Sequence, residues 1–392
     1  MRTESVFVLC KSNPHNDPRP SRMIDWLNKD YNVSVFADDT FISNDGNHEA
    51  LLPNKQSRGL QSKLKALIIK LYKLLLLVFR RFDELVEVSF VGKNQILERP
   101  ELKTFDLIVT HDIVLLPLAC NIANTSKARI LFDAREYYPR EFENNFLWRL
   151  LIQPFNKHLC ENYLHQCDKV ITVSDGIARE YKTEYGVDAE VIMSLPDFHE
   201  IEPMLSQNNS IRIIYHGQAS PDRQIEKMIE IIDYLGEHFS LDLMLVPPAR
   251  LHQAYWRKIA TMAKKRARVK IISPVPMKKI IEFTSQYDIG LFICPPTTFN
   301  LKYALPNKFF EYIQARLAVA IGPSIEMRKV VEKYRCGIVA NDFTPRSLAD
   351  EISEIGHDEL LFFKKQSNNA ALDLNATKNS IKIQRIVKDL LV

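Results

Sequence analysis

The length, composition and charge of the chain exclude several classes of protein. Its 392 residues, of which 46% are hydrophobic and 26% charged, are too many for one ordinary core and too apolar for a disordered chain, so two domains are expected. A formal net charge of +4 is too small for a dedicated nucleic-acid-binding protein. The six cysteines lack CxxC spacing, which predicts neither a zinc site nor a disulfide framework and fits a reducing, cytoplasmic compartment.

The first half of the chain alternates short apolar runs with helix-like segments. The runs are SVFVLC (5–10), VSVFAD (33–38), FDLIVTH (105–111), ARILFDA (128–134) and KVITVS (169–174). Strands separated by helices are typical of βαβ units and a parallel sheet. The first residues lack the apolar core and cleavage site of a secretory signal, so no export is expected.

The longest apolar run, residues 64–79, is interrupted by lysines and falls short of the roughly 20 apolar residues that span a bilayer. On a helix of about 100° per residue, its apolar side chains share one face. That face comprises Leu64, Leu67, Ile68, Leu71, Leu74, Leu75 and Val78. Residues 55–81 also carry eight Lys or Arg residues and no acidic residue. The segment is either a helix lying on an anionic membrane or a crossover helix, and the pattern favours the crossover helix because burial on a sheet needs the same stripe.

The second half repeats the alternation of strands and helices. Its apolar runs are IRIIYHG (211–217), LDLMLV (241–246), VKIISPV (269–275), IGLFIC (289–294) and LAVAIG (317–322). A polar segment with two prolines, residues 194–210, separates the halves and predicts a domain boundary near residue 204. We therefore expect domains at 1–204 and 205–372, and a final helix within 373–392 that packs back on the first domain.

Ligands of open α/β sheets bind beyond the carboxyl ends of the strands, and ionisable residues stand at those ends in the first half. Candidates for acid–base chemistry or sugar binding are Asp112, Asp133, Arg135 and Glu136, and candidates for the acceptor side are Asp17, Arg19 and His111. A purely structural role in caps and turns is the alternative for each of them.

The second half offers cations for a phosphate group. Glycine is scarce and neither GxGxxG nor a Walker loop is present, so side chains and helix N-termini would have to bind an anion. Asn307 and Lys308 stand at a predicted helix start, Glu311 follows one turn later, and Arg223 precedes another helix. Lys308 and Arg223 are the candidates to neutralise a diphosphate, and Glu311 is the candidate to accept hydrogen bonds from a ribose. The alternative is an ordinary capped helix with a surface Lys–Glu pair, and a loop arginine paired with Asp222 or Glu226.

These windows together resemble the GT-B glycosyltransferases, and most closely family 4 of bacterial polysaccharide and glycan assembly. The resemblance rests on the DPR loop, FDLIVTHD, DAREYYP, CDKVITVSDGIAREY, the YHG loop, SPVP, YDIGLF, PNKFFEY and GIVANDFTPRSLADEI, in that order along most of the chain. It implies two Rossmann-like parallel-sheet domains facing across a cleft. It also implies a donor bound by the second domain, with Pro274 and Val275 near the base, and an acceptor that enters from the first domain.

Two residues depart from the family pattern. Arg135 stands where the family's DAHE segment has histidine, and Tyr303 stands where the paired-glutamate motif has its first glutamate. The resemblance implies that the histidine helps to hold the transferred sugar in retaining members. These two departures therefore leave open which donor sugar is used and whether the reaction retains or inverts the configuration of the transferred sugar.

The expected function is that of a hexosyltransferase-type glycosyltransferase. Its expected substrates are a UDP- or GDP-sugar donor and a glycan or lipid-linked acceptor in bacterial surface polysaccharide assembly. The resemblance implies a retaining reaction without a metal or other cofactor, in the cytoplasm or on the inner face of the plasma membrane. Two alternatives stay open: a nucleotide-sugar epimerase on the same fold, and a non-catalytic partner protein that retains the fold.

Overall fold

The computed structural model divides into two compact units. It describes residues 4–11, 13–14, 17–37, 40–42, 48–50, 60–90, 104–205, 210–247 and 253–392. The first unit comprises Met1–Ile192 with Ser380–Val392, and the second comprises Met193–Asn379. The boundary thus lies 12 residues before the predicted position at 204. The linker looks polar in sequence, but its Leu195 is buried in the core of the second unit, with Met193 and Ile201 packed against that core.

The first unit is built on a mostly parallel sheet. Its strands are β1 (Ser5–Cys10), β2 (Asn32–Ala37), β3 (Thr40–Ile42), β4 (His48–Ala50), β5 (Leu107–Thr110), β6 (Arg129–Ala134), β7 (Lys169–Thr172) and β8 (Ala189–Val191). They lie in the order β4-β3-β2-β1-β5-β6-β7-β8. β3 and β4 pair antiparallel at one edge, which the sequence did not predict.

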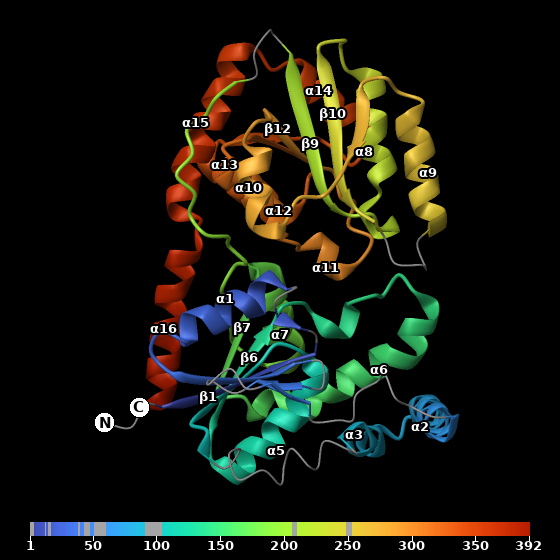
Figure 1. Ribbon diagram of the computed structural model, residues 1–392, viewed down its shortest axis with the longest axis vertical. Helices are drawn as coiled ribbons and strands as arrows, with labels where there is room; N and C mark the ends of the chain where they lie inside the picture. Colours follow the sequence, from blue (N-terminus) through green and yellow to red (C-terminus); the bar gives the residue numbers. More distant parts are fainter. Residues whose placement is uncertain are drawn as a thin grey trace. The chain divides into compact units, whose positions relative to one another are not determined.

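Helices and short 3-10 turns connect these strands (Figure 1). They are α1 (Pro18–Leu27), α2 (Leu60–Val78), α3 (Phe82–Phe90), η4 (Ile113–Leu115), α5 (Leu116–Ser126), η5 (Tyr138–Arg140), α6 (Phe146–Tyr163), η6 (Leu164–Gln166) and α7 (Asp175–Tyr185). The final helix, α16 (Ala376–Leu391), returns to this unit, because Ile383, Ile386 and Val387 lie in a core cluster with Val6 and Val8 of β1.

The second unit has a parallel sheet of its own. Its strands are β9 (Ile211–Gln218), β10 (Phe239–Val246), β11 (Val269–Ile272), β12 (Ile289–Phe292), β13 (Ala318–Ile321) and β14 (Gly337–Val339), in the order β11-β10-β9-β12-β13-β14. Its helical segments are η7 (Pro221–Arg223), α8 (Ile225–Ile231), η8 (Ile232–Tyr234), α9 (Gln253–Lys264), η10 (Met277–Lys279), α10 (Ile280–Thr284), α11 (Phe299–Lys302), α12 (Asn307–Gln314), α13 (Ile325–Tyr334), α14 (Pro345–Ser353) and α15 (His357–Asp373). Both units are therefore Rossmann-like α/β units, as predicted.

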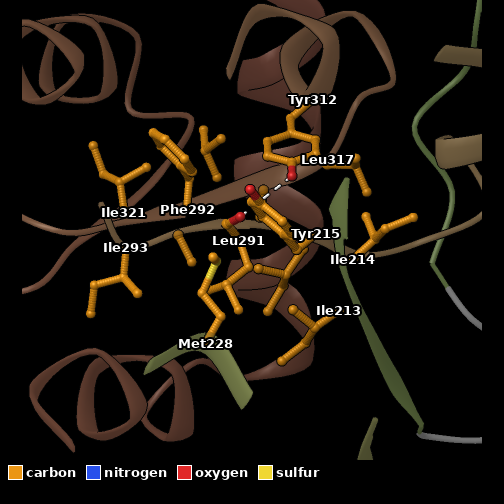
Figure 2. Packing of buried hydrophobic residues seen from close by; sticks show 14 of the residues in the cluster. Ile213, Ile214, Tyr215, Met228, Leu291, Phe292, Ile293, Tyr312, Leu317 and Ile321 are labelled. Atoms are coloured by element: carbon orange, nitrogen blue, oxygen red, sulfur yellow. Dashed lines mark hydrogen bonds between the residues drawn. The ribbon is translucent and has the colours of Figure 1, made fainter. Parts of the chain in front are cut away.

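The strand order reverses once in the parallel part of each sheet, between β1 and β5 and between β9 and β12. At such a point the connections leave in opposite directions, and a crevice opens beyond the carboxyl ends of the two strands. In the second unit β12 pairs with β9 only at Ile289 and Gly290, and the Tyr312 hydroxyl bridges the strands beyond (Figure 2). It accepts from the backbone N–H of His216 at 3.3 Å and donates to the carbonyl oxygen of Leu291 at 3.3 Å.

Gly290 makes room for this tyrosine. A Cβ atom at that position would lie 2.3 Å from the Tyr312 ring, closer than any real contact. The absence of a side chain therefore lets α12 pack tightly against the point where the strand order reverses.

Helix α2 is not the buried crossover helix that the sequence favoured. All seven side chains of its predicted apolar face are exposed, whereas Leu76, on another side of the helix, is buried. The same periodicity arises whether the stripe meets a sheet or not, so the sequence could not decide this. Among the described residues, no helix has the length and hydropathy needed to span a bilayer.

Candidate functional site

Lys308 occupies the point of strand reversal in the second unit. It lies in the first turn of α12, and its Nζ donates to the Tyr215 hydroxyl at 2.9 Å. The ammonium also lies 4.1 Å from the centre of the Tyr215 ring and 4.9 Å from that of Phe292. Tyr215 belongs to β9 and Phe292 ends β12, so Lys308 is held between the two strands that flank the crevice.

The charge of Lys308 is poorly compensated. Its hydrogen bond goes to a neutral hydroxyl, no ion pair with a carboxylate is found among the described residues, and the Glu311 charge only partly offsets the effect of burial. Burial, and next the neighbouring Arg223 guanidinium, lower the pKa of Lys308 well below its usual value. Two cations close together at a strand end form an environment that a diphosphate would stabilise.

Gly217 allows Lys308 to reach this position. Its φ of +141° is a conformation that residues with side chains rarely adopt, and a Cβ there would lie 2.7 Å from Lys308 Nζ. The YHG loop of the sequence is therefore required by the packing of the lysine against β9.

Glu311 lies on the next turn of α12 and faces the following residue of β9. Its Oε2 is 3.4 Å from His216 Nε2, and its side chain is 14% exposed. Burial, and next the Lys308 charge, lower the pKa of His216 to about 3, so the imidazole is neutral and the contact is not an ion pair. The two side chains therefore lie next to each other at the carboxyl end of β9 without a hydrogen bond between them.

The other predicted donor residues lie at the same carboxyl edge of the sheet. Arg223 ends the 3-10 turn that follows β9 and is half-buried. Asn307 is the first residue of α12, so the cap position is Pro306, which provides no side-chain hydrogen bond. Pro274 and Val275 follow β11, where Pro274 is exposed and Val275 packs partly on the core.

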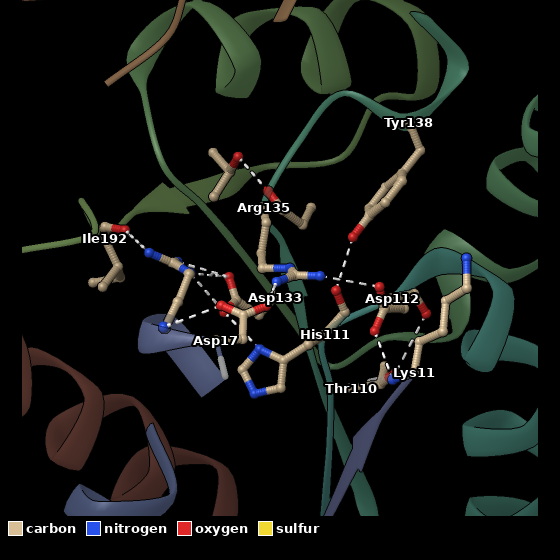
Figure 3. Close-up of polar contacts among 12 residues, drawn as sticks. Lys11, Asp17, Thr110, His111, Asp112, Asp133, Arg135, Tyr138 and Ile192 are labelled. Atoms are coloured by element: carbon tan, nitrogen blue, oxygen red, sulfur yellow. Dashed lines mark hydrogen bonds and ion pairs between the residues drawn. The ribbon is translucent and has the colours of Figure 1, made fainter. Parts of the chain in front are cut away.

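A second polar cluster lies at the strand ends of the first unit, and Asp133 is its buried centre (Figure 3). The Arg19 guanidinium donates to both carboxylate oxygens at 2.7 Å, and to the carbonyl oxygen of Ile192 at 2.7 Å. His111 Nδ1 lies 2.9 Å from Asp133 Oδ2. Burial alone would raise the pKa of Asp133, but the Arg19 charge and the hydrogen bonds from His111 and Arg19 hold it well below its usual range.

Asp133 is therefore a permanently ionised carboxylate whose oxygens are occupied. The structure places it, together with Arg19, as a residue that fixes α1 against β6, and leaves it no free oxygen for the acid–base role predicted from the sequence. His111 Nε2 is buried and has no hydrogen-bond partner among the described residues.

Arg135 lies between two carboxylates. Its guanidinium pairs with Asp17 and donates to Asp112 Oδ1 at 3.1 Å, and the second oxygen of Asp112 accepts from the backbone N–H of Lys11 at 2.9 Å. Burial would lower the pKa of Arg135, but nearby charges including Asp17 and Asp112 raise it, so the residue stays charged. The charge of Arg135 is therefore already balanced by Asp17 and Asp112.

Glu141 was missed as a candidate in the sequence, although it closes the DAREYYPRE segment. Burial first, and then the charge of Glu136, raise the pKa of Glu141 to about 7. A carboxyl group with such a pKa exchanges a proton near neutral pH, as a general acid or base requires. The signal available in the sequence was the spacing of Glu136 and Glu141, two acidic residues five positions apart.

The loop that carries these carboxylates is firmly held. The Tyr138 hydroxyl donates to the carbonyl oxygen of His111 at 2.8 Å, and the Tyr181 hydroxyl donates to that of Glu136 at 2.8 Å. Asn156 of α6 donates to the carbonyl oxygen of Tyr138 at 2.9 Å. The backbone from Glu136 to Tyr138 is thus fixed to β5, α6 and α7.

No protein-family model matches the chain, and no curated protein matches it. Solved structures do resemble it. Sucrose-phosphate synthase from Thermosynechococcus elongatus is 11% identical with a TM-score of 0.70, and the match covers 99% of each chain. HepE from Anabaena in complex with UDP-glucose is 12% identical with a TM-score of 0.67, covering 98% of this chain and 99% of that one. TarM from S. aureus, in a complex that includes UDP, is 11% identical with a TM-score of 0.59, over 74% of this chain and only 55% of that one.

These likenesses establish the fold. The chain is an α/β protein of two Rossmann-like domains, the GT-B fold of the glycosyltransferases that it resembles. At 11–12% identity the family 4 assignment stays a prediction.

Proposed function

We propose that this chain is a glycosyltransferase that transfers a hexose from a UDP-sugar to a glycan or lipid-linked acceptor. The observation that carries the proposal is the poorly compensated charge of Lys308 beside Arg223 at the point of strand reversal. The neighbours in complexes with UDP and UDP-glucose support uracil as the base, and a GDP-sugar is the alternative.

The second domain binds the donor in this proposal. Lys308 and Arg223 contact the diphosphate, and the N–H groups of the first turn of α12, which lack a side-chain cap, add further donors. Glu311, which lies beside His216, accepts hydrogen bonds from the ribose diol. Asn307 lies at the helix start and the Pro274-Val275 turn is next to the base.

The first domain provides the acceptor side and the groups near the transferred sugar. Glu136 and Glu141 are the carboxylates proposed to exchange a proton or bind hydroxyl groups, since Asp133 is saturated by Arg19 and His111. Asp112, Asp17 and Arg135 form the ion-paired frame around them. A retaining outcome follows from the resemblance to family 4 and belongs to the proposal.

The leaving diphosphate is stabilised in this mechanism by preorganised cations. As the bond between the sugar and the β-phosphate breaks, negative charge grows on the phosphate oxygens, and a fixed ammonium and guanidinium lower the energy of that charge. The proposal assigns the chain no cofactor and no metal, and places it in bacterial surface polysaccharide assembly, in the cytoplasm or on the inner face of the plasma membrane.

Ligand-induced thermal stabilisation tests the donor assignment. UDP should raise the melting temperature of the protein more than CMP or AMP does, because a ligand that binds only the folded state stabilises it. Product analysis with donor alone then separates the reaction classes, since an epimerase converts the donor without an acceptor. Absence of any nucleotide-dependent stabilisation, in the wild type as in a Lys308→Ala variant, would contradict the proposal.

A further inference from the structure

Helix α2 carries an apolar surface that is exposed in the part of the first unit that the structure describes. The seven residues Leu64, Leu67, Ile68, Leu71, Leu74, Leu75 and Val78, called here the α2 apolar face, are each between 45% and 62% exposed. Phe79, directly after the helix, is 70% exposed. Single exposed apolar residues are ordinary, but a whole helix face of them marks an interaction surface.

The opposite side of α2 attaches the helix to the unit. Leu76 is buried, Ala66 and Leu77 are half-buried, and α2 packs against α3 and α6. At about 100° per residue, these three side chains lie on the side of the helix away from the centre of the α2 apolar face. The fold thus holds α2 in place with the apolar face directed outward.

Cations border the α2 apolar face on both sides. Lys65 and Lys70 are exposed, and on a helical wheel of about 100° per residue they fall beyond opposite edges of the face. The sequence has no acidic residue between Lys55 and Arg81. Long lysine side chains at the edges of an apolar stripe can extend to lipid phosphates while the stripe enters the acyl region.

A second helix of the same unit begins with exposed apolar side chains. In the first turns of α6, Phe146 is 66% exposed, Leu147 is 64% exposed and Leu150 is 52% exposed. Arg149, also exposed, lies 5.9 Å from the centre of the Phe146 ring. Because α6 is one of the two helices against which α2 packs, the same unit presents two adjacent elements with apolar and cationic side chains.

We infer that the α2 apolar face binds the surface of an anionic phospholipid bilayer, with α2 lying in the membrane plane. The charge of the segment favours lipid phosphates and disfavours a second copy of the same cationic helix. The inference does not depend on the proposed transfer reaction, because the residues that carry it are distinct from those of the donor site.

Vesicle flotation tests the inference. The protein should float with vesicles of phosphatidylcholine and phosphatidylglycerol, and bind at least tenfold less to phosphatidylcholine alone at low ionic strength. Leu67→Asp/Leu71→Asp should reduce binding to the anionic vesicles at least tenfold, because it places two charges in the apolar face. Lys65→Gln/Lys70→Gln should reduce it by more than tenfold, at about fivefold for each lysine.

Matched controls separate a specific surface from general stickiness. Leu372→Asp/Ile381→Asp changes two residues of 55% and 61% exposure outside α2, and Lys264→Gln/Lys265→Gln removes two exposed cations of the second unit. Both should bind anionic vesicles as the wild type does. Equal loss in variants and controls, or no binding to either vesicle, would overturn the inference. So would a concentration-dependent dimer in light scattering that Leu67→Asp/Leu71→Asp abolishes, because the face would then bind a second copy.

Discussion

At the scale of single residues, the charge of Lys308 leads to a binding prediction. Lys308→Ala should weaken UDP binding by about 1.5–3 kcal/mol, the usual contribution of a hydrogen bond to a charged group. Lys302→Ala is the matched control, because it removes an exposed lysine six positions away. Isothermal titration calorimetry measures both. Equal affinity of wild type and Lys308→Ala, with both proteins folded, would remove Lys308 from the donor site.

The lowered pKa of Lys308 predicts proton uptake on binding. A diphosphate favours the charged ammonium, so the pKa of Lys308 rises in the complex, and UDP binding at a pH above the lowered value draws a proton from the buffer. Calorimetry in buffers of different ionisation enthalpy should detect this uptake at pH values between the lowered pKa and the ordinary lysine value of 10.5. Lys308→Ala should lose it, and the same uptake in wild type and variant would assign the proton to another group.

Replacing the Glu141 carboxylate should raise the stability of the protein and lower its activity. Its pKa of about 7 in the folded protein exceeds the ordinary value of 4.5, so folding favours the protonated form. The stability that this residue contributes is therefore lost as the pH rises from about 4.5 through about 7. Glu141→Gln mimics the protonated form, and should therefore raise the melting temperature by a few degrees at pH 8 but not at pH 4. Turnover should fall about a hundredfold if the carboxylate exchanges a proton.

The half-buried Glu143 provides a control for the same loop. Glu143→Gln removes the charge of an ion pair with Arg140 at 2.5 Å and should leave turnover within about twofold, since a partly exposed ion pair contributes little. Differential scanning fluorimetry across pH measures the melting temperatures of both variants, and an initial-rate assay measures their turnover. A Glu141→Gln variant that keeps full activity would exclude Glu141 from catalysis.

At the scale of elements, Asp133 connects helix α1 to strand β6 through Arg19. Asp133→Asn should destabilise the protein by about 3–5 kcal/mol, because it leaves a buried guanidinium without its counter-charge. Asp17→Asn, in a partly exposed pair with Arg135, should cost about 1 kcal/mol or less. Denaturant unfolding measures both. A stable Asp133→Asn variant with greatly reduced turnover would instead support the catalytic role predicted from the sequence.

The sequence patterns predicted the strands and helices better than they predicted the side-chain contacts between them. The run SVFVLC coincides with β1, because an apolar run flanked by helix signals specifies a buried strand locally. Nothing local specifies that Lys308 meets Tyr215 or that Arg19 meets Asp133, since these contacts depend on the packing of helices on distant strands. The direction of α2 was likewise beyond the sequence, because one stripe of leucines serves a sheet and a membrane equally well.

At the scale of the whole molecule, the chain crosses between its two units twice. It leaves the first unit at Ile192 and re-enters it at Ser380, so the carboxyl-terminal residues complete a core that begins with β1. The stability of the first unit therefore depends on a helix that follows the whole second unit along the chain, whereas the cluster around Lys308 lies wholly within Met193–Asn379.

This connection predicts a selective effect of two neighbouring isoleucines. Ile383 is fully buried in the first core, and Ile381, two positions earlier on the same helix, is 61% exposed. Ile383→Ala should destabilise the first unit by about 2–5 kcal/mol through the cavity it leaves, and Ile381→Ala should change stability by less than about 0.5 kcal/mol. Limited proteolysis should then cleave the Ile383→Ala protein first within residues 1–192, while UDP-dependent stabilisation of the second unit persists. Loss of both units together in Ile383→Ala would show that they unfold as one cooperative body.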